Sequence, residues 1–216
     1  MLEELKNAYK LVQYGLSLKK QMAFAVGFAV IGIVLDVVTR GRQATGSFYI
    51  VLSGLFIYQL IISSDVSTLV QSSPYKKKIQ ITYPLLAVIP WNYITFTIVV
   101  IMHGLFIKAD GAEYATTHSS NIFLIGLLLM ITMAYFGVCY KFFISSTVIM
   151  VLLVFSAMIP VNILLRKGCS LFDSYGLCVG LAYVLLTLGT VISFLLSKLV
   201  YKFDLSKLAF KMMLKS

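Results

Sequence analysis

The stretch "QMAFAVGFAVIGIVLDVVT", Gln21 to Thr39, decides the fold class of this chain. Asp36 is its only charged residue, and its length is close to the roughly 20 apolar residues that a helix needs to cross a bilayer. The apolar residues are continuous and do not alternate with polar ones, which favours a helix over a barrel strand. The stretch therefore predicts a membrane-spanning helix.

Five further apolar runs follow along the chain. They are Phe48–Ser64, Leu85–Ile107, Ile122–Tyr140, Phe143–Leu165 and Tyr175–Ser197. Of the 216 residues, 60% are apolar and 12% are charged, whereas soluble domains have about 45–50% and about 25%. We expect an all-α membrane protein with six transmembrane helices, which form a single transmembrane domain over residues 1–216.

The lysines and arginines between the runs indicate the orientation of the helices. With the N-terminus in the cytoplasm, thirteen of the 18 basic residues lie on the cytoplasmic side. The five on the outer side are Arg40, Arg42, Lys108, Arg166 and Lys167. The positive-inside rule then places both termini, a loop over residues 65–84 and a tail over residues 198–216 in the cytoplasm, with the chain in the plasma membrane. These flanking cations account for the formal charge of +10, so we expect no nucleic-acid partner.

Residues 1–20 have the pattern of an amphipathic helix. One face carries apolar side chains, namely Leu2, Leu5, Tyr9, Val12 and Leu16, and the other carries Glu3, Lys6, Lys10, Gln13 and Ser17. Such a helix lies in the membrane interface with its apolar face toward the lipid. The start of the chain has two acids and no cleavage pattern, so we expect the first membrane span to be retained.

Few residues in this chain could support catalysis or bind a metal. The two histidines and eight acids form no HExxH pattern, no nucleophile elbow and no phosphate-binding loop, so we expect no catalytic site, metal or cofactor on the chain. Asp36, Gln59 and His103 are the polar candidates within spans. Arg40 lies four residues after Asp36, which predicts an ion pair at the outer interface, with a functional site as the alternative.

The remaining polar and small residues favour structural roles. For His103, near the outer end of its span, we expect a hydrogen-bonded interfacial histidine, with a proton relay as the alternative. His118 is predicted in an outer loop, and Gln59 to bond between helices. The pairs Gly27 with Ala23 and Gly180 with Gly176 predict close helix contacts, and Pro84, Pro90 and Pro160 predict kinks. The three cysteines are expected to be free thiols, with a Cys169–Cys178 bridge as the alternative.

The predicted cytoplasmic loop contains the sequence "SSPYKKKI", Ser72 to Ile79. Ser73 and Pro74 fit the cap and first position of a short helix. Lys76, Lys77 and Lys78 would then lie in the first turn, where the helix dipole disfavours cations. These lysines are better explained by membrane orientation, by anionic lipids or by an acidic partner surface.

This loop resembles one in the permease subunits of bacterial type-2 ABC exporters. There, an apolar residue, Ser, Pro and a basic cluster lie between the second and third spans, matched here by Leu69, Ser72, Pro74, Lys76 to Lys78 and Ile79. The chain is also similar to these half-size permeases in its six expected spans, its cytoplasmic termini and its interfacial N-terminal helix. The resemblance implies that the loop docks on a separate ATP-binding subunit, which holds ATP and Mg. The implied docking residues are Ser73, Pro74, Tyr75, Lys76, Lys77, Lys78 and Ile79.

The resemblance further implies a second permease copy, or a related permease, and export of a hydrophobic or amphipathic substrate such as a peptide or a drug-like molecule. Membrane lipids are the other expected partners. One alternative is the substrate-capturing membrane subunit of an energy-coupling vitamin importer, which is also small and ATPase-dependent. Another is a membrane scaffold protein without transport activity.

Overall fold

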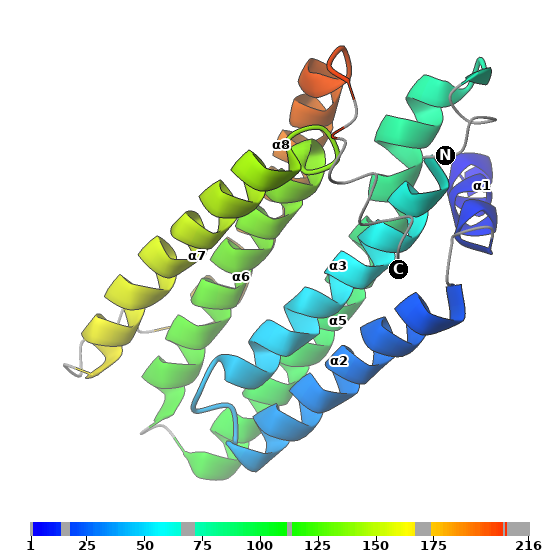
Figure 1. The fold of residues 1–216 in the computed structure, drawn as a ribbon. Helices are drawn as coiled ribbons and strands as arrows, with labels where there is room; N and C mark the ends of the chain where they lie inside the picture. The colour runs from blue at the N-terminus through cyan, green and yellow to red at the C-terminus, as the bar shows by residue number, and fades with distance from the viewer. Residues whose placement is uncertain are drawn as a thin grey trace.

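The computed structural model describes residues 2–13, 18–65, 72–111, 114–166, 174–204 and 206, and these residues form helices and turns without a strand. Figure 1 shows the long helices running along one another in a bundle. The helices are α1 (Leu2–Gln13), α2 (Leu18–Val38), α3 (Thr45–Asp65), the π-helical turn η1 (Lys78–Thr82), α5 (Tyr83–Asp110), α6 (Ala115–Val138), α7 (Phe143–Arg166) and α8 (Tyr175–Val200).

Within the described residues, five helices are long and apolar enough to cross a membrane, namely α2, α5 together with η1, α6, α7 and α8. The apolar segment of α3, Thr45–Leu60, is shorter than these five. The all-α membrane fold expected from the sequence is therefore confirmed. Exposed apolar side chains such as Val34 on α2, Leu152 on α7 and Leu199 on α8 cover the outside of the bundle, as is expected of helices in contact with lipid.

The helix that contains the predicted fourth span begins two helical turns before the start of that span. The helix α6 begins at Ala115, not at Ile122, and His118 is therefore inside a helix and not in a loop. The polar residues that obscured this start bond within the helix: Ser119 Oγ donates to the Ala115 carbonyl at 2.8 Å, and Ser120 Oγ to the Thr116 carbonyl at 2.9 Å. Such bonds satisfy the hydroxyl groups without a loop.

The core lies where α3, α5, α6 and α8 meet, and its fully buried side chains include Phe96, Leu129, Phe136 and Leu186. Among the closest packed pairs are α2 with α3 and α6 with α8, while α7 packs mainly on α6. Glycines allow the close approach. A Cβ at Gly126 would be 2.6 Å from the Ala182 Cβ, whereas one at Gly27 or Gly180 meets nothing within 4 Å, so those two predicted contact positions do not mediate packing within the chain.

The chain alternates between two ends of the bundle (Figure 1). One end, named here the basic end, has α1, residues 72–82, the turn between α6 and α7, and residues 201–204 after α8. The other, the polar end, has the turns that join α2 to α3 and α5 to α6. Of the helix predicted over residues 1–20, residues 2–13 form α1, which packs against α5 and α3, residues 18–20 belong to α2, and residues 14–17 lie outside the described residues. In α1 Ala8 is buried and Tyr9 is 47% exposed.

Pro84 accounts for the π-helical turn that precedes α5. A proline in a helix lacks an N–H group, and its ring clashes with the carbonyl four residues earlier, here that of Gln80. The backbone widens at this point, and the Tyr83 N–H donates to the Lys78 carbonyl five residues back. π-turns of this kind are frequent at functional sites. Pro90 and Pro160 lie inside α5 and α7.

Candidate functional site

The basic turn, residues Ser73 to Ile79, leads directly into η1. The Tyr75 N–H donates to Ser73 Oγ at 3.1 Å, and the Lys76 N–H donates to the Ser73 carbonyl at 3.1 Å. Ser73 therefore caps a turn that contains Pro74, as its position in the sequence predicts. The Ile79 N–H then donates to the Tyr75 carbonyl at 3.0 Å and begins the helical path toward α5.

Two contacts connect the basic turn to other parts of the basic end. Lys78 Nζ lies 3.1 Å from Glu4 Oε1 of α1 in an exposed ion pair. Lys77 Nζ lies 5.9 Å from the centre of the Tyr201 ring, which follows α8. Lys141 Nζ lies 5.7 Å from the same ring and donates to the Phe203 carbonyl at 2.5 Å. The turn is thus connected to α1, and through Tyr201 to the end of α8.

The outer surface of the basic turn is accessible. Tyr75 is 63% exposed, and Pro74 and Lys77 are also exposed. Tyrosine is enriched at protein interfaces because its ring adds apolar area, and charges around such a ring orient an oppositely charged partner. Gln80, one turn further along, is buried, and its amide has no hydrogen-bond partner among the residues that the structure describes.

A second candidate site, the buried polar network, lies near the polar end. Asp36 of α2 is fully buried, and its Oδ1 accepts the Ser47 N–H at 3.0 Å while its Oδ2 accepts Ser47 Oγ–H at 2.5 Å. A Cβ at Gly46 would be 2.4 Å from Asp36 Oδ1, so only glycine allows the carboxylate this position. The expected ion pair between Asp36 and Arg40 was wrong, because Asp36 turns into the bundle.

Both histidines of the chain join this network. His103 Nε2 lies 3.3 Å from Ser47 Oγ and 3.9 Å from Asp36 Oδ2, and His103 Nδ1 lies 3.1 Å from His118 Nδ1. His103 and His118 are both fully buried. His118 Nε2 is buried without a hydrogen-bond partner among the described residues. Four side chains from α2, α3, α5 and α6 therefore form one continuous row of hydrogen-bonding atoms.

The turn between α2 and α3 covers the network and is itself strained. The Gly41 N–H donates to the Asp36 carbonyl, and the Arg40 N–H to the Val37 carbonyl, which is the bonding pattern of a Schellman cap. Arg40 has a φ of 51°, where glycine is usual, at a cost of about 1 kcal/mol. In this conformation Arg40 Nη1 lies 2.6 Å from Asp110 Oδ1 of α5, and Arg42 Nη2 lies 3.7 Å from Asp110 Oδ2.

The structure brings only some of the predicted site residues together. Asp36 and His103 share the buried network, whereas Gln59 is exposed on α3 and lies outside it. Ser47, Gly46 and His118 were missed. The two histidines flank the connection between two consecutive spans, and this was a signal that could have paired them. Cys178 is a buried free thiol, and Cys169, its partner in the alternative bridge, lies outside the described residues.

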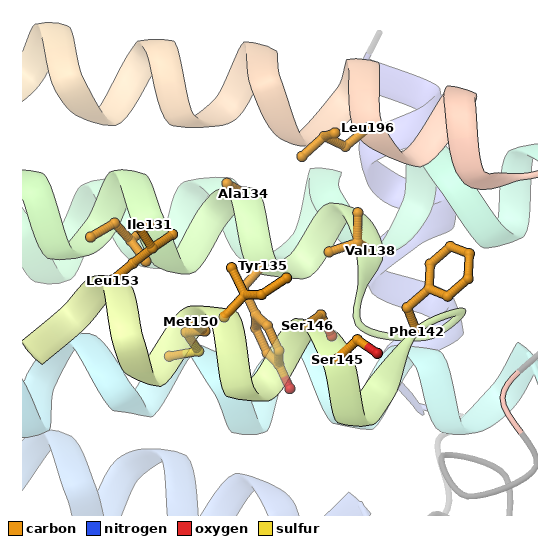
Figure 2. A pocket seen from close by; sticks show the side chains of 11 residues that line it. Ile131, Ala134, Tyr135, Val138, Phe142, Ser145, Ser146, Met150, Leu153 and Leu196 are labelled. Carbon is orange, nitrogen blue, oxygen red and sulfur yellow. The ribbon is translucent and has the colours of Figure 1, made fainter. Parts of the chain in front are cut away.

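A groove of about 370 Å³ lies between α6 and α7 (Figure 2). Its lining is almost entirely apolar and includes Ile131, Ile149, Met150 and Leu153, with Leu196 from α8. The Tyr135 hydroxyl lies 3.3 Å from Thr147 Oγ1, so the phenol group is partnered within the groove wall. The volume is within the range of sites for small apolar ligands, about 300–1,000 Å³.

No protein-family model, curated protein or solved structure matches this chain.

Proposed function

We propose that this chain is the permease subunit of an ATP-driven exporter of the type-2 ABC class, with the basic turn as the docking site for a separate ATP-binding subunit. The observation that carries the proposal is the placement of this turn. It is exposed, it lies beside α1, and it continues through η1 into α5. A partner that moves the turn would therefore also move a membrane-length helix.

The structure of η1 supports transmission of such a movement. In a π-turn the N–H group bonds to the carbonyl five residues back instead of four, so the turn holds an inserted residue that can be absorbed or shifted when the helix is displaced. The buried Gln80 amide has no hydrogen-bond partner among the described residues. A rearranged turn would bring other backbone groups within its reach and could supply one. The free-energy cost of rearranging η1 would therefore be smaller than that of a helix whose polar groups are all hydrogen-bonded.

In this proposal α3 is a sixth span, and both termini lie in the cytoplasm of a plasma-membrane protein. The thirteen basic residues assigned to that side support the orientation. A second permease copy or a related permease would complete the pathway. The apolar groove between α6 and α7 supports a hydrophobic or amphipathic substrate, because its walls provide almost no polar partner for a charged one. ATP and Mg would be held by the partner subunit.

The test is site-directed photo-crosslinking in membranes of cells that express the full chain with the ATP-binding subunits of the same genome. A photoreactive residue at position 75 replaces the exposed Tyr75, and the matched control replaces Lys108, which is exposed near the other end of α5. We expect a crosslink to an ATP-binding subunit from position 75 and none from position 108. Equal crosslinking from both positions, or none from position 75, contradicts the proposal.

A further inference from the structure

We propose that Asp36, Ser47, His103 and His118 form a proton relay, which binds one proton at the polar end of the bundle and delivers it to the carboxylate of Asp36. The inference does not depend on an ATP-binding partner, because it rests only on the buried polar network. Three pairs of atoms in this network lie at hydrogen-bonding distance. They are Asp36 Oδ2 with Ser47 Oγ, Ser47 Oγ with His103 Nε2, and His103 Nδ1 with His118 Nδ1.

The contact between the two Nδ1 atoms limits the protonation states of the pair. At 3.1 Å, one nitrogen must donate and the other must accept. Two imidazolium rings would point two N–H groups at each other, so His103 and His118 are not both charged. Neutral histidine carries a single ring hydrogen, and the choice of donor in this bond therefore fixes the tautomer of both rings.

With Asp36 ionised, a single arrangement of hydrogens in the row satisfies all of these bonds. The Ser47 hydroxyl donates to Asp36, so its oxygen accepts from His103 Nε2–H. His103 Nδ1 is then without hydrogen and accepts from His118 Nδ1–H. His118 Nε2 remains unprotonated, which agrees with its lack of a partner among the described residues. This nitrogen is the site where a proton can be added.

Proton addition at His118 Nε2 reverses every bond in the row. The Nδ1 hydrogen of His118 moves to His103 Nδ1, and the Nε2 hydrogen of His103 moves to Ser47 Oγ. The hydroxyl hydrogen of Ser47 moves to Asp36 Oδ2. One proton from water is taken up, one carboxylic acid is formed, and both histidines end neutral with exchanged tautomers. Each step breaks one bond to hydrogen and forms another, and no other reactant is needed.

The surroundings of the row indicate where the proton would come from. Asp110 and Arg42 act electrostatically on His118, and Arg42 is 46% exposed at the side chain. The carboxylate of Asp110 is an acidic group at this end, and the exposed Arg40 holds it in place. Other titratable side chains near this end of the elements that form and surround the row include Tyr49, Lys108, Tyr114, Tyr175 and Cys178.

Binding of the extra proton by the relay would change the hydrogen bonds between α2 and α3. An ionised Asp36 accepts two bonds from Ser47, and a protonated Asp36 donates one of them instead. The link between α2 and α3 is therefore weaker in the protonated state, because bonds to a charged acceptor are about twice as strong as neutral ones. The relay thus makes the packing of α2 on α3 sensitive to the proton concentration at the polar end.

The two histidines of the chain are both in the relay, which permits a direct test. The full chain is purified with a histidine-free affinity tag and labelled with ¹⁵N in the histidine rings. It is titrated by NMR from about pH 9 to about pH 3, a range that includes the ordinary pKa values of histidine, about 6.5, and aspartate, about 3.9. We expect one step in which His103 and His118 exchange tautomers together and neither becomes imidazolium. Independent titration, formation of an imidazolium, or no change over the range overturns the relay.

Variants locate the path of the proton. In Ser47→Ala the bond from the Ser47 N–H to Asp36 is kept but the hydroxyl step is removed, so the shared tautomer step should be lost. Ser47→Thr keeps a hydroxyl and should restore it. Ser120→Ala is the matched control, because Ser120 lies two residues from His118 and bonds only to its own helix at the Thr116 carbonyl. A shared tautomer step that persists in Ser47→Ala contradicts the proposed path through Ser47. If Ser47→Ala does not fold, the titration of the unchanged chain still tests whether the relay exists.

Discussion

Ionisable side chains at the basic end of the bundle are mostly exposed, apart from the buried Lys141, whereas several at the polar end are enclosed. Lys78 and Glu4 form their pair with side chains 55% and 41% exposed, while Asp36 and His103 contact each other at 0% exposure. An exposed pair contributes about 0–1 kcal/mol to stability, and a buried group that loses its partner costs about 1–3 kcal/mol. The comparison indicates that the basic end is suited to binding partners and that the polar end is fixed by its own contacts.

The largest effect is expected where the polar end is packed most closely. In Gly46→Ala the new methyl group would meet Asp36 Oδ1 at 2.4 Å and force α2 away from α3. We expect a loss of about 3 kcal/mol in the free energy of unfolding. The measurement is unfolding in SDS followed by the fluorescence of Trp91, the single tryptophan. Gly27→Ala, which meets nothing within 4 Å, is the control and should change little; equal effects would contradict this account of the packing.

The next effect concerns the buried carboxylate. Asp36→Ala leaves the Ser47 N–H and hydroxyl without their acceptor in a site that water does not reach. We expect a loss of about 2 kcal/mol in the same SDS unfolding measurement. The control at the basic end is Glu4→Ala, which removes an exposed carboxylate and should cost less than about 1 kcal/mol. Similar losses for both variants would remove the distinction between the two ends.

At the basic end, the effect should be on association and not on folding. The double variant Lys76→Gln, Lys77→Gln keeps the Lys78–Glu4 pair and removes two charges from the turn. We expect its affinity for the ATP-binding subunit to fall about tenfold, which corresponds to about 1.4 kcal/mol, with unchanged unfolding. The check is co-purification over a series of salt concentrations. An unchanged affinity would leave membrane orientation as the role of these lysines.

A gain of stability is expected at η1. Gln80→Met replaces a buried amide without a partner among the described residues by an apolar side chain of similar length. The free energy of unfolding should rise by about 1 kcal/mol, because the cost of burying the amide is removed. If η1 must rearrange during coupling, the same variant should lower ATP hydrolysis by the assembled complex. A stabilised variant with full coupled activity would separate η1 from the mechanism.

The smallest effect is expected for the ion pair between α1 and the basic turn. Lys78→Glu alone should destabilise the chain only slightly, since it places two acids together on an exposed surface. The exchange of both charges, Lys78→Glu with Glu4→Lys, should restore the original value, and high salt should remove the difference. The measurement is SDS unfolding at low and high salt. A double variant no better than the single one would show that the pair contributes nothing.

The buried free thiol of Cys139 reports whether the basic end is folded. Burial raises the pKa of the Cys139 thiol, in the turn after α6, to about 12. The thiolate that alkylating reagents attack is therefore rare at neutral pH while the chain is folded. Protection of Cys139 from alkylation reports that the basic end is intact in each variant above.

Much of the fold could be predicted from composition and pattern, because a continuous apolar run of about 20 residues leaves the backbone no alternative to a helix in lipid. The ends of the helices were less predictable. The polar residues before Asn121 indicated a loop, but their hydroxyl groups bond to carbonyls of the same helix. The cap at Ser73 was predictable because it depends on neighbours two and three residues away.

The sequence by itself determined the class of fold, the positions of the apolar helices and the exposed basic turn, since all three follow from local composition. The tertiary structure decided which polar groups meet. Asp36 lies four residues from Arg40 in the chain, yet the Schellman cap turns Arg40 toward Asp110 and leaves Asp36 to Ser47 and His103. The bond between His103 and His118 joins two helices, α5 and α6. Contacts of this kind depend on how helices pack, and packing depends on glycines such as Gly46 whose neighbours are distant in the sequence.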